Sequence, residues 1–115
     1  MTTVAIIVAA GKGNRAGGKV PKQWRKIAGK LVADWSIDAF KKHKLVDFVI
    51  VVLPPKKSLP RNDVMTCTGG KSRSHSVYKG LLAAKSLSPN KVLIHDVARP
   101  AVTEEIITDV INAIN

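Results

Sequence analysis

Glycines and basic side chains are concentrated in one short segment of this 115-residue chain, residues 9–23. The segment follows an apolar run, Val4 to Val8, that is typical of a buried strand. It contains four glycines, no carboxylate and four cations, which are Lys12, Arg15, Lys19 and Lys22. Glycines let backbone N–H groups approach an anion closely, and cations neutralise its charge. The pattern therefore predicts a loop that binds a polyphosphate.

Two common phosphate-binding patterns nearly fit this segment. The dinucleotide fingerprint Gly-x-Gly-x-x-Gly fits Gly11 and Gly13, but Ala16 stands at its last glycine. The Walker pattern Gly-x-x-x-x-Gly-Lys-Ser/Thr also fits from Gly13, but Val20 replaces the hydroxyl that would hold magnesium. A glycine-rich turn after a strand is therefore weak evidence alone, and other segments must decide the ligand.

The elements that would position this loop alternate between strands and helices. Apolar runs predict strands at residues 4–8, 48–53, 64–68 and 91–95. Helical spacing predicts helices at 32–43, 73–87 and 103–114. Alternation of this kind predicts an α/β fold with a mostly parallel sheet and helices on both faces. Ligands of such sheets gather at the carboxyl ends of the strands, where the polar clusters 9–23, 69–76 and 95–100 fall.

The same spacing predicts which side chains are buried. The first helix should turn Val32, Trp35, Ala39 and Phe40 inward, and the second Val77, Leu81 and Ala84. The last helix should be capped by Thr103, with a broad apolar stripe from Ile106 to Ile114. Residues 92–94 and 48–53 should form strands that are buried on both sides. Because the chain stops as this last helix finishes, we expect a truncated form of a longer sheet.

Composition excludes some classes of protein. The chain has a net charge of +11, 45% hydrophobic and 4% aromatic residues, and one cysteine, Cys67, which we expect to be inert. No apolar run has membrane-spanning length and no signal peptide is evident, so we expect a cytoplasmic protein. Nucleic-acid binding is an alternative reading of the charge. However, the cations are not interleaved with aromatic residues, which favours a small phosphorylated ligand over nucleic acid.

Three motifs in order resemble those of the 2-C-methyl-D-erythritol 4-phosphate cytidylyltransferases. The Ala9–Gln23 loop resembles the signature loop of nucleotidyltransferases. Gly69–Leu81 resembles the family element Gly-Gly-x-x-Arg-x-x-Ser-Val-x-x-Gly-Leu, and Val92–Pro100 resembles Val-Leu-Val-His-Asp-Ala-Ala-Arg-Pro. The resemblance implies a Rossmann-like sheet of the nucleotide-diphospho-sugar transferase type. Residues 1–115 would then be the N-terminal portion of a single nucleotidyltransferase domain, similar to forms fused to a cyclodiphosphate synthase.

The resemblance also implies roles for individual residues. Arg15 and Lys22 match the catalytic cations, and Arg99 matches a substrate-binding arginine. Asp96 matches the aspartate that binds Mg²⁺. The positions that match the nucleotide-binding residues are Ala9, Ala10, Gly11, Gly13, Gly70 and Ser76.

Four neighbouring positions are less clearly assigned. Arg73 could face phosphate or pair within the fold, so its role stays open. His75 and His95 are expected to be structural. Lys71 departs from the acidic or small residue common in the family, which puts base recognition there in doubt.

The implied reaction transfers CMP from CTP to 2-C-methyl-D-erythritol 4-phosphate and releases pyrophosphate, in isoprenoid precursor biosynthesis. Three alternatives stay open: a ribitol 5-phosphate cytidylyltransferase, a truncated non-catalytic nucleotide-binding module, and a basic nucleic-acid-binding domain. The family's second half carries further site residues and an arm that completes a homodimer. We therefore expect little turnover from residues 1–115 alone.

Overall fold

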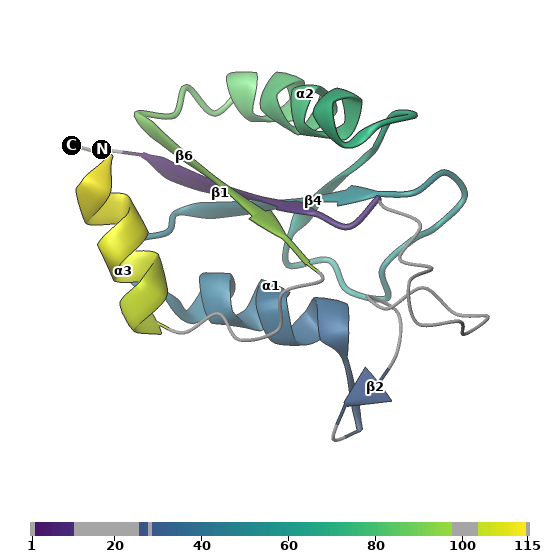
Figure 1. Cartoon of the computed structure of the whole chain (residues 1–115), viewed down its shortest axis with the longest axis horizontal. Helices are drawn as coiled ribbons and strands as arrows, with labels where there is room; N and C mark the ends of the chain where they lie inside the picture. The colour runs from purple at the N-terminus through teal and green to yellow at the C-terminus, as the bar shows by residue number, and fades with distance from the viewer. Residues whose placement is uncertain (1, 11–25, 28, 98–103, 115) are drawn as a thin grey trace.

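Four parallel strands form one sheet in the computed structural model, which describes residues 2–10, 26–27, 29–97 and 104–114. Their order across the sheet is β5-β4-β1-β6. The strands are β1 (Thr3–Val8), β4 (Phe48–Leu53), β5 (Met65–Thr68) and β6 (Lys91–Asp96). The helices are α1 (Val32–Lys42), α2 (Arg73–Lys85) and α3 (Glu104–Ala113). Helix α2 covers one face of the sheet, and α1 and α3 cover the other (Figure 1).

Strand β1 is central, and all six of its residues are buried. Side chains alternate between the two faces of a strand, so β1 contributes to two separate cores. Ala5 and Ile7 belong to the core under α1 and α3, whereas Val4 and Ile6 belong to the core under α2. This double burial explains why β1 is a continuous apolar run, as expected of a parallel sheet with helices on both faces.

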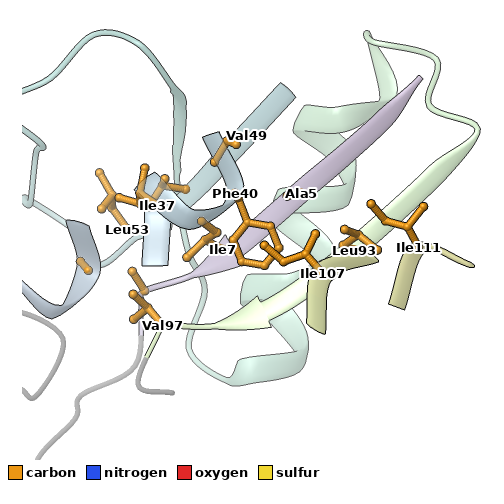
Figure 2. Close-up of a cluster of buried hydrophobic side chains, with 13 residues drawn as sticks. Ala5, Ile7, Ile37, Phe40, Val49, Leu53, Leu93, Val97, Ile107 and Ile111 are labelled. Carbon is orange, nitrogen blue, oxygen red and sulfur yellow. The ribbon is translucent and has the colours of Figure 1, made fainter. Parts of the chain in front are cut away.

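The larger core joins two helices to the sheet. Ile37 and Phe40 of α1 and Ile107 and Ile111 of α3 belong to one buried cluster with Ile7, in which Ile107 lies near Phe40 and Ile111 near Leu93 (Figure 2). All six side chains are at most 4% exposed. The packing holds α3, the last described element, against the face of the sheet that α1 also covers.

Helix α2 packs against the other face of the sheet through small residues, and at Gly80 there is no room for a side chain. A Cβ added at Gly80 would lie 2.6 Å from Ile6 Cγ2 and 3.0 Å from Val52 Cγ2. Ala84, one turn later, is 1% exposed. At the start of the helix the Ser72 hydroxyl accepts a hydrogen bond from the His75 N–H at 3.1 Å, which is an N-cap. These contacts fix the first turn of α2 relative to the ends of the strands.

Several buried positions differ from the sequence-based predictions. Trp35 and Leu81 were predicted to point into a core. They are 42% and 41% exposed, so this prediction is wrong for both. In α3 only Ile107 and Ile111 are buried, and the predicted cap Thr103 lies outside the described residues. Ile94 is 43% exposed because β6 is an edge of the described sheet, so the prediction that 92–94 is buried on both sides is wrong.

A short antiparallel hairpin precedes α1 and was not predicted. It consists of β2 (Lys26–Ile27) and β3 (Lys30–Leu31), with Gly29 at a φ of 79° in the turn between them. A positive φ is easily adopted by glycine, which suits it to this position. Among the described residues, no helix combines the length and apolar character that a membrane span requires.

Candidate nucleotide site at the carboxyl edge of the sheet

The carboxyl ends of β1, β4, β5 and β6 are held together beyond their last ladder residues. The Ala9 N–H donates to the Val52 carbonyl at 2.8 Å, and the Gly69 N–H donates to the Leu53 carbonyl at 2.8 Å. On the other side of β1, the Val97 N–H donates to the Val8 carbonyl at 3.1 Å. These bonds fix the backbone at the edge where ligands of parallel sheets bind.

Three of the predicted nucleotide-binding residues meet at this edge. The Gly70 N–H donates to the Ser76 Oγ at 3.1 Å, which joins the turn after β5 to the first turns of α2. Ser76 is 3% exposed. Ala10, which follows β1, lies close to Ser76, because a Cβ added at Gly69 would contact both residues. The structure therefore brings Ala10, Gly70 and Ser76 together, with Ala9 preceding them in the chain.

Gly69 is what allows this close approach, although it was not among the predicted site residues. A Cβ at this position would lie 2.5 Å from Ala10 Cβ and 2.6 Å from Ser76 Oγ. Both distances are shorter than real Cβ contacts, so a larger residue would push the three segments apart. The Gly-Gly pair in the 69–81 motif was the sequence signal for this requirement.

Asp96, the predicted metal ligand, pairs with Arg73 across the same edge. The Arg73 Nε lies 3.0 Å from Asp96 Oδ1 and 3.2 Å from Oδ2, and Arg73 Nη2 lies 3.1 Å from Oδ2. The hydrogen bond with Asp96 raises the pKa of Arg73 above its ordinary value. The open question about Arg73 is thus answered: in this structure it pairs within the fold.

Asp96 is the predicted metal ligand, and Arg73 is its hydrogen-bond partner in this structure. The Asp96 side chain is 36% exposed at the end of β6, and its charge already attracts a cation in Arg73. Mg²⁺ commonly binds proteins through one or two carboxylates plus the phosphates of its substrate. Within the described ranges no group of three or more His, Cys, Asp or Glu side chains could enclose a metal. A single carboxylate could hold Mg²⁺ only with further oxygen ligands such as phosphates, and the metal role of Asp96 stays a prediction.

Five predicted site residues lie outside the described residues: Gly11, Gly13, Arg15, Lys22 and Arg99. Their predicted roles are not tested by the geometry. The last described residues before these positions are Ala10, which follows β1, and Val97, which follows the adjacent strand β6.

Three further side chains near the site show contacts that fit structural roles. The His95 ring lies 5.2 Å from the Phe40 ring, against the larger core. The His75 ring lies 6.4 Å from that of Tyr78, its neighbour on α2. Cys67 is half-buried; burial raises the pKa of its thiol, and the Lys79 charge opposes this only in part. A raised pKa disfavours the reactive thiolate, as expected of an inert cysteine.

The chain matches a known protein family over nearly its full length. The family described as IspD: 2-C-methyl-D-erythritol 4-phosphate cytidylyltransferase matches residues 3–115. The chain belongs to this family. The resemblance drawn from the three motifs is thereby confirmed.

Relatives in the IspD family are similar over the full chain. The chain is 46% identical over 119 residues to the bifunctional enzyme IspD/IspF of Ruegeria pomeroyi, covering 100% of this chain and 32% of that protein. It is 45% identical to the 2-C-methyl-D-erythritol 4-phosphate cytidylyltransferase of Roseobacter denitrificans, covering 99% and 53%. The chain thus spans about half the length of its monofunctional relative and a third of the bifunctional one.

Solved structures confirm the predicted α/β fold class. The Francisella tularensis 2-C-methyl-D-erythritol 4-phosphate cytidylyltransferase is similar with a TM-score of 0.77 and 29% identity, covering 98% of this chain and 52% of that one. The bifunctional IspDF of Campylobacter jejuni gives a TM-score of 0.83 at 21% identity, covering 100% and 31%. At that identity the second likeness shows the fold alone.

Proposed function

We propose that this chain provides the nucleotide-binding part of a cytidylyltransferase that transfers CMP from CTP to 2-C-methyl-D-erythritol 4-phosphate and releases pyrophosphate. The observation that carries the proposal is the meeting of Ala10, Gly70 and Ser76 at the carboxyl edge of the sheet, the edge at which β6 ends with Asp96. A nucleotide at a parallel sheet is expected at this edge. Membership of the IspD family identifies the reaction class.

The cytosine base would lie against the joined ends of β1, β5 and α2. Backbone groups of Ala9, Ala10 and Gly70 would present donors and acceptors at fixed positions. The Ser76 hydroxyl accepts from the Gly70 N–H and retains its own proton, which it can donate. Because Ser76 is buried and held by the backbone, its position is defined before the nucleotide binds.

The triphosphate would be held by the glycine-rich segment that follows Ala10. Gly11 and Gly13 would let backbone N–H groups approach the phosphates, and Arg15 and Lys22 would neutralise charge on the α-phosphate. A phosphate oxygen of the acceptor attacks the α-phosphorus, the bond to the β-phosphate oxygen breaks, and pyrophosphate leaves. The attacking phosphate is already ionised, so positioning and electrostatic stabilisation suffice.

Two side chains complete the proposed site. Asp96 would hold Mg²⁺, which when bound neutralises the phosphates of CTP. Arg99 would hold the acceptor phosphate, because a guanidinium forms paired hydrogen bonds with phosphate oxygens. We further propose a cytoplasmic enzyme that binds CTP and a polyol phosphate rather than nucleic acid, and that would form a homodimer in a longer form of the chain.

Calorimetry with CTP, ATP and GTP, each with and without Mg²⁺, tests the nucleotide assignment in this chain. We expect CTP to bind most tightly, and only that result supports the proposal. Equal binding of all three, or displacement of CTP by duplex DNA, would contradict it.

Turnover distinguishes the acceptors. Pyrophosphate release is measured with CTP, Mg²⁺ and either methylerythritol phosphate or ribitol 5-phosphate. Faster release with the first supports the proposed reaction, and faster release with the second supports the ribitol alternative. Because the chain spans about half the length of its monofunctional relatives, CTP binding without release would support a nucleotide-binding module.

A further inference from the structure

We propose that Arg73 competes with the divalent cation for Asp96, so that it holds this carboxylate in the metal-free protein and sets the affinity for the metal. The inference rests on the proposed function, which assigns Mg²⁺ to Asp96. It assigns a role to Arg73, which belongs to the 69–81 motif but has no role in the proposed reaction.

The first support is the geometry of the pair. Both Asp96 oxygens accept hydrogen bonds from the Arg73 guanidinium, at 3.0 to 3.2 Å. A metal ion that binds this carboxylate must share or displace these contacts. Because the guanidinium is a full positive charge at contact distance, it also repels any second cation at the same oxygens.

The second support is the position of Arg73 in its helix. It is the first residue of α2, whose first turn contains no acidic side chain. The helix dipole is positive at this end and disfavours a cation, so Arg73 is poorly placed without a carboxylate nearby. Asp96 provides that carboxylate from the end of β6, which pairs with β1.

The third support is the exposure of the pair. The side chains of Arg73 and Asp96 are 60% and 36% exposed, so water screens their attraction. A pair of this kind holds the carboxylate in place but is weak enough for a metal with its nucleotide to displace.

Calorimetry of CTP binding to this chain, with and without Mn²⁺, tests the proposal, because the gain in affinity that Mn²⁺ provides measures metal binding at the site. Removing a unit positive charge about 4 Å from a doubly charged metal ion in a water-like environment should tighten Mn²⁺ binding roughly thirtyfold in Arg73→Gln. Lys85→Gln removes an exposed charge from the other end of α2 and serves as the control, with binding unchanged. An unchanged or weaker affinity in Arg73→Gln would overturn the proposal.

Asp96→Asn separates this inference from the metal assignment itself. We expect Asp96→Asn to abolish the Mn²⁺ site, and Arg73→Gln to have no further effect in that background. If Asp96→Asn binds Mn²⁺ like the unaltered chain, the assigned metal site of the proposed function is wrong. If Asp96→Asn abolishes binding but Arg73→Gln does not tighten it, only the competition is wrong.

The Arg73 side chain gives a second readout that is independent of activity. Its Nε–H proton signal in NMR reports whether the carboxylate is still paired. We expect this signal to move toward that of Asp96→Asn as Mg²⁺ is added with CTP. A signal that stays at its metal-free position while Mg²⁺ and CTP bind would contradict the displacement.

Discussion

The Ser76 hydroxyl accepts a hydrogen bond from the Gly70 N–H at 3.1 Å, and this bond ties the start of α2 to the turn after β5. Both residues belong to the 69–81 motif, and both lie next to the end of β1 through the contacts of Gly69. This buried hydroxyl thus adds a link between α2 and the turn after β5 to the backbone bonds that already join the ends of the strands.

Replacing this hydroxyl should weaken both CTP binding and the fold. Ser76→Ala leaves the Gly70 N–H without its acceptor, which should cost about 1–3 kcal/mol of unfolding free energy. It also removes the donor that we assign to the base, so the Kd for CTP should rise by about tenfold. Ser74→Ala changes an exposed hydroxyl in the same turn and should change neither quantity. Calorimetry and urea unfolding measure the two effects, and unchanged CTP binding in Ser76→Ala would remove the serine from the site.

Enlarging Gly69 should separate the segments. In Gly69→Ala the new methyl group would meet Ala10 Cβ at 2.5 Å and Ser76 Oγ at 2.6 Å, so the backbone must move. Overpacking of this kind should cost about 1–3 kcal/mol of stability and lower the affinity for CTP. Thr66→Ala on the exposed side of β5 is the control, with CTP affinity retained. Equal CTP affinity in Gly69→Ala and the unaltered chain would show that close approach at this edge is unimportant.

The cations of the 9–23 segment should matter more for the reaction than those elsewhere. In a form of the protein that turns over, Arg15→Gln or Lys22→Gln should each lower kcat by roughly 10²–10³, as expected for loss of one preorganised charge. Lys56→Gln removes an exposed cation from the loop after β4 and should leave kcat unchanged. Pyrophosphate release measures these rates. If both glutamine variants kept full activity, the proposed stabilisation of the α-phosphate would be wrong.

Sequence patterns located the elements well because a central parallel strand has a simple signature. The apolar run Phe48–Leu53 was predicted as a strand and has these bounds in the structure. Burial of individual side chains was less predictable. Helical spacing defines a broad apolar stripe on a helix but does not show which of its residues face the core. Trp35 lies at the flank of that stripe and packs its ring beneath the Lys30 ammonium, at 4.6 Å. Ile94 was expected to be buried because nothing in the run 92–94 marks it as belonging to an edge strand of the described sheet.

The sequence patterns could not predict contacts between residues that are distant in the chain. The motifs placed Arg73 and Asp96 at the same edge, but only the structure shows their side chains in contact across 23 positions. The same holds for Arg61, which lies in a loop with no recognisable motif. Its guanidinium contacts three carboxylates on α1 and in its own loop, those of Asp34, Asp38 and Asp63.

This Arg61 cluster should make the stability of the protein depend on pH in acid. Hydrogen bonds from Arg61 lower the pKa of Asp63 to about 2. Burial raises the pKa of Asp38, but hydrogen bonds from Lys30 and Arg61 outweigh burial and lower it overall. A carboxyl group whose pKa is lower in the folded protein adds stability above its unfolded pKa, near 4. That stability is lost as the pH falls through the folded value.

Thermal unfolding between pH 6 and pH 2 tests this dependence. We expect the Tm of the unaltered chain to fall between about pH 4 and pH 2, the window set by the two lowered pKa values. In Arg61→Met the Tm should be several degrees lower at pH 6, and its further fall in acid should be shallower because the pKa values return toward normal. Lys44→Gln, an exposed cation that follows α1, should keep the acid dependence of the unaltered chain. An equally steep fall in Arg61→Met would mean that other carboxylates govern the acid unfolding.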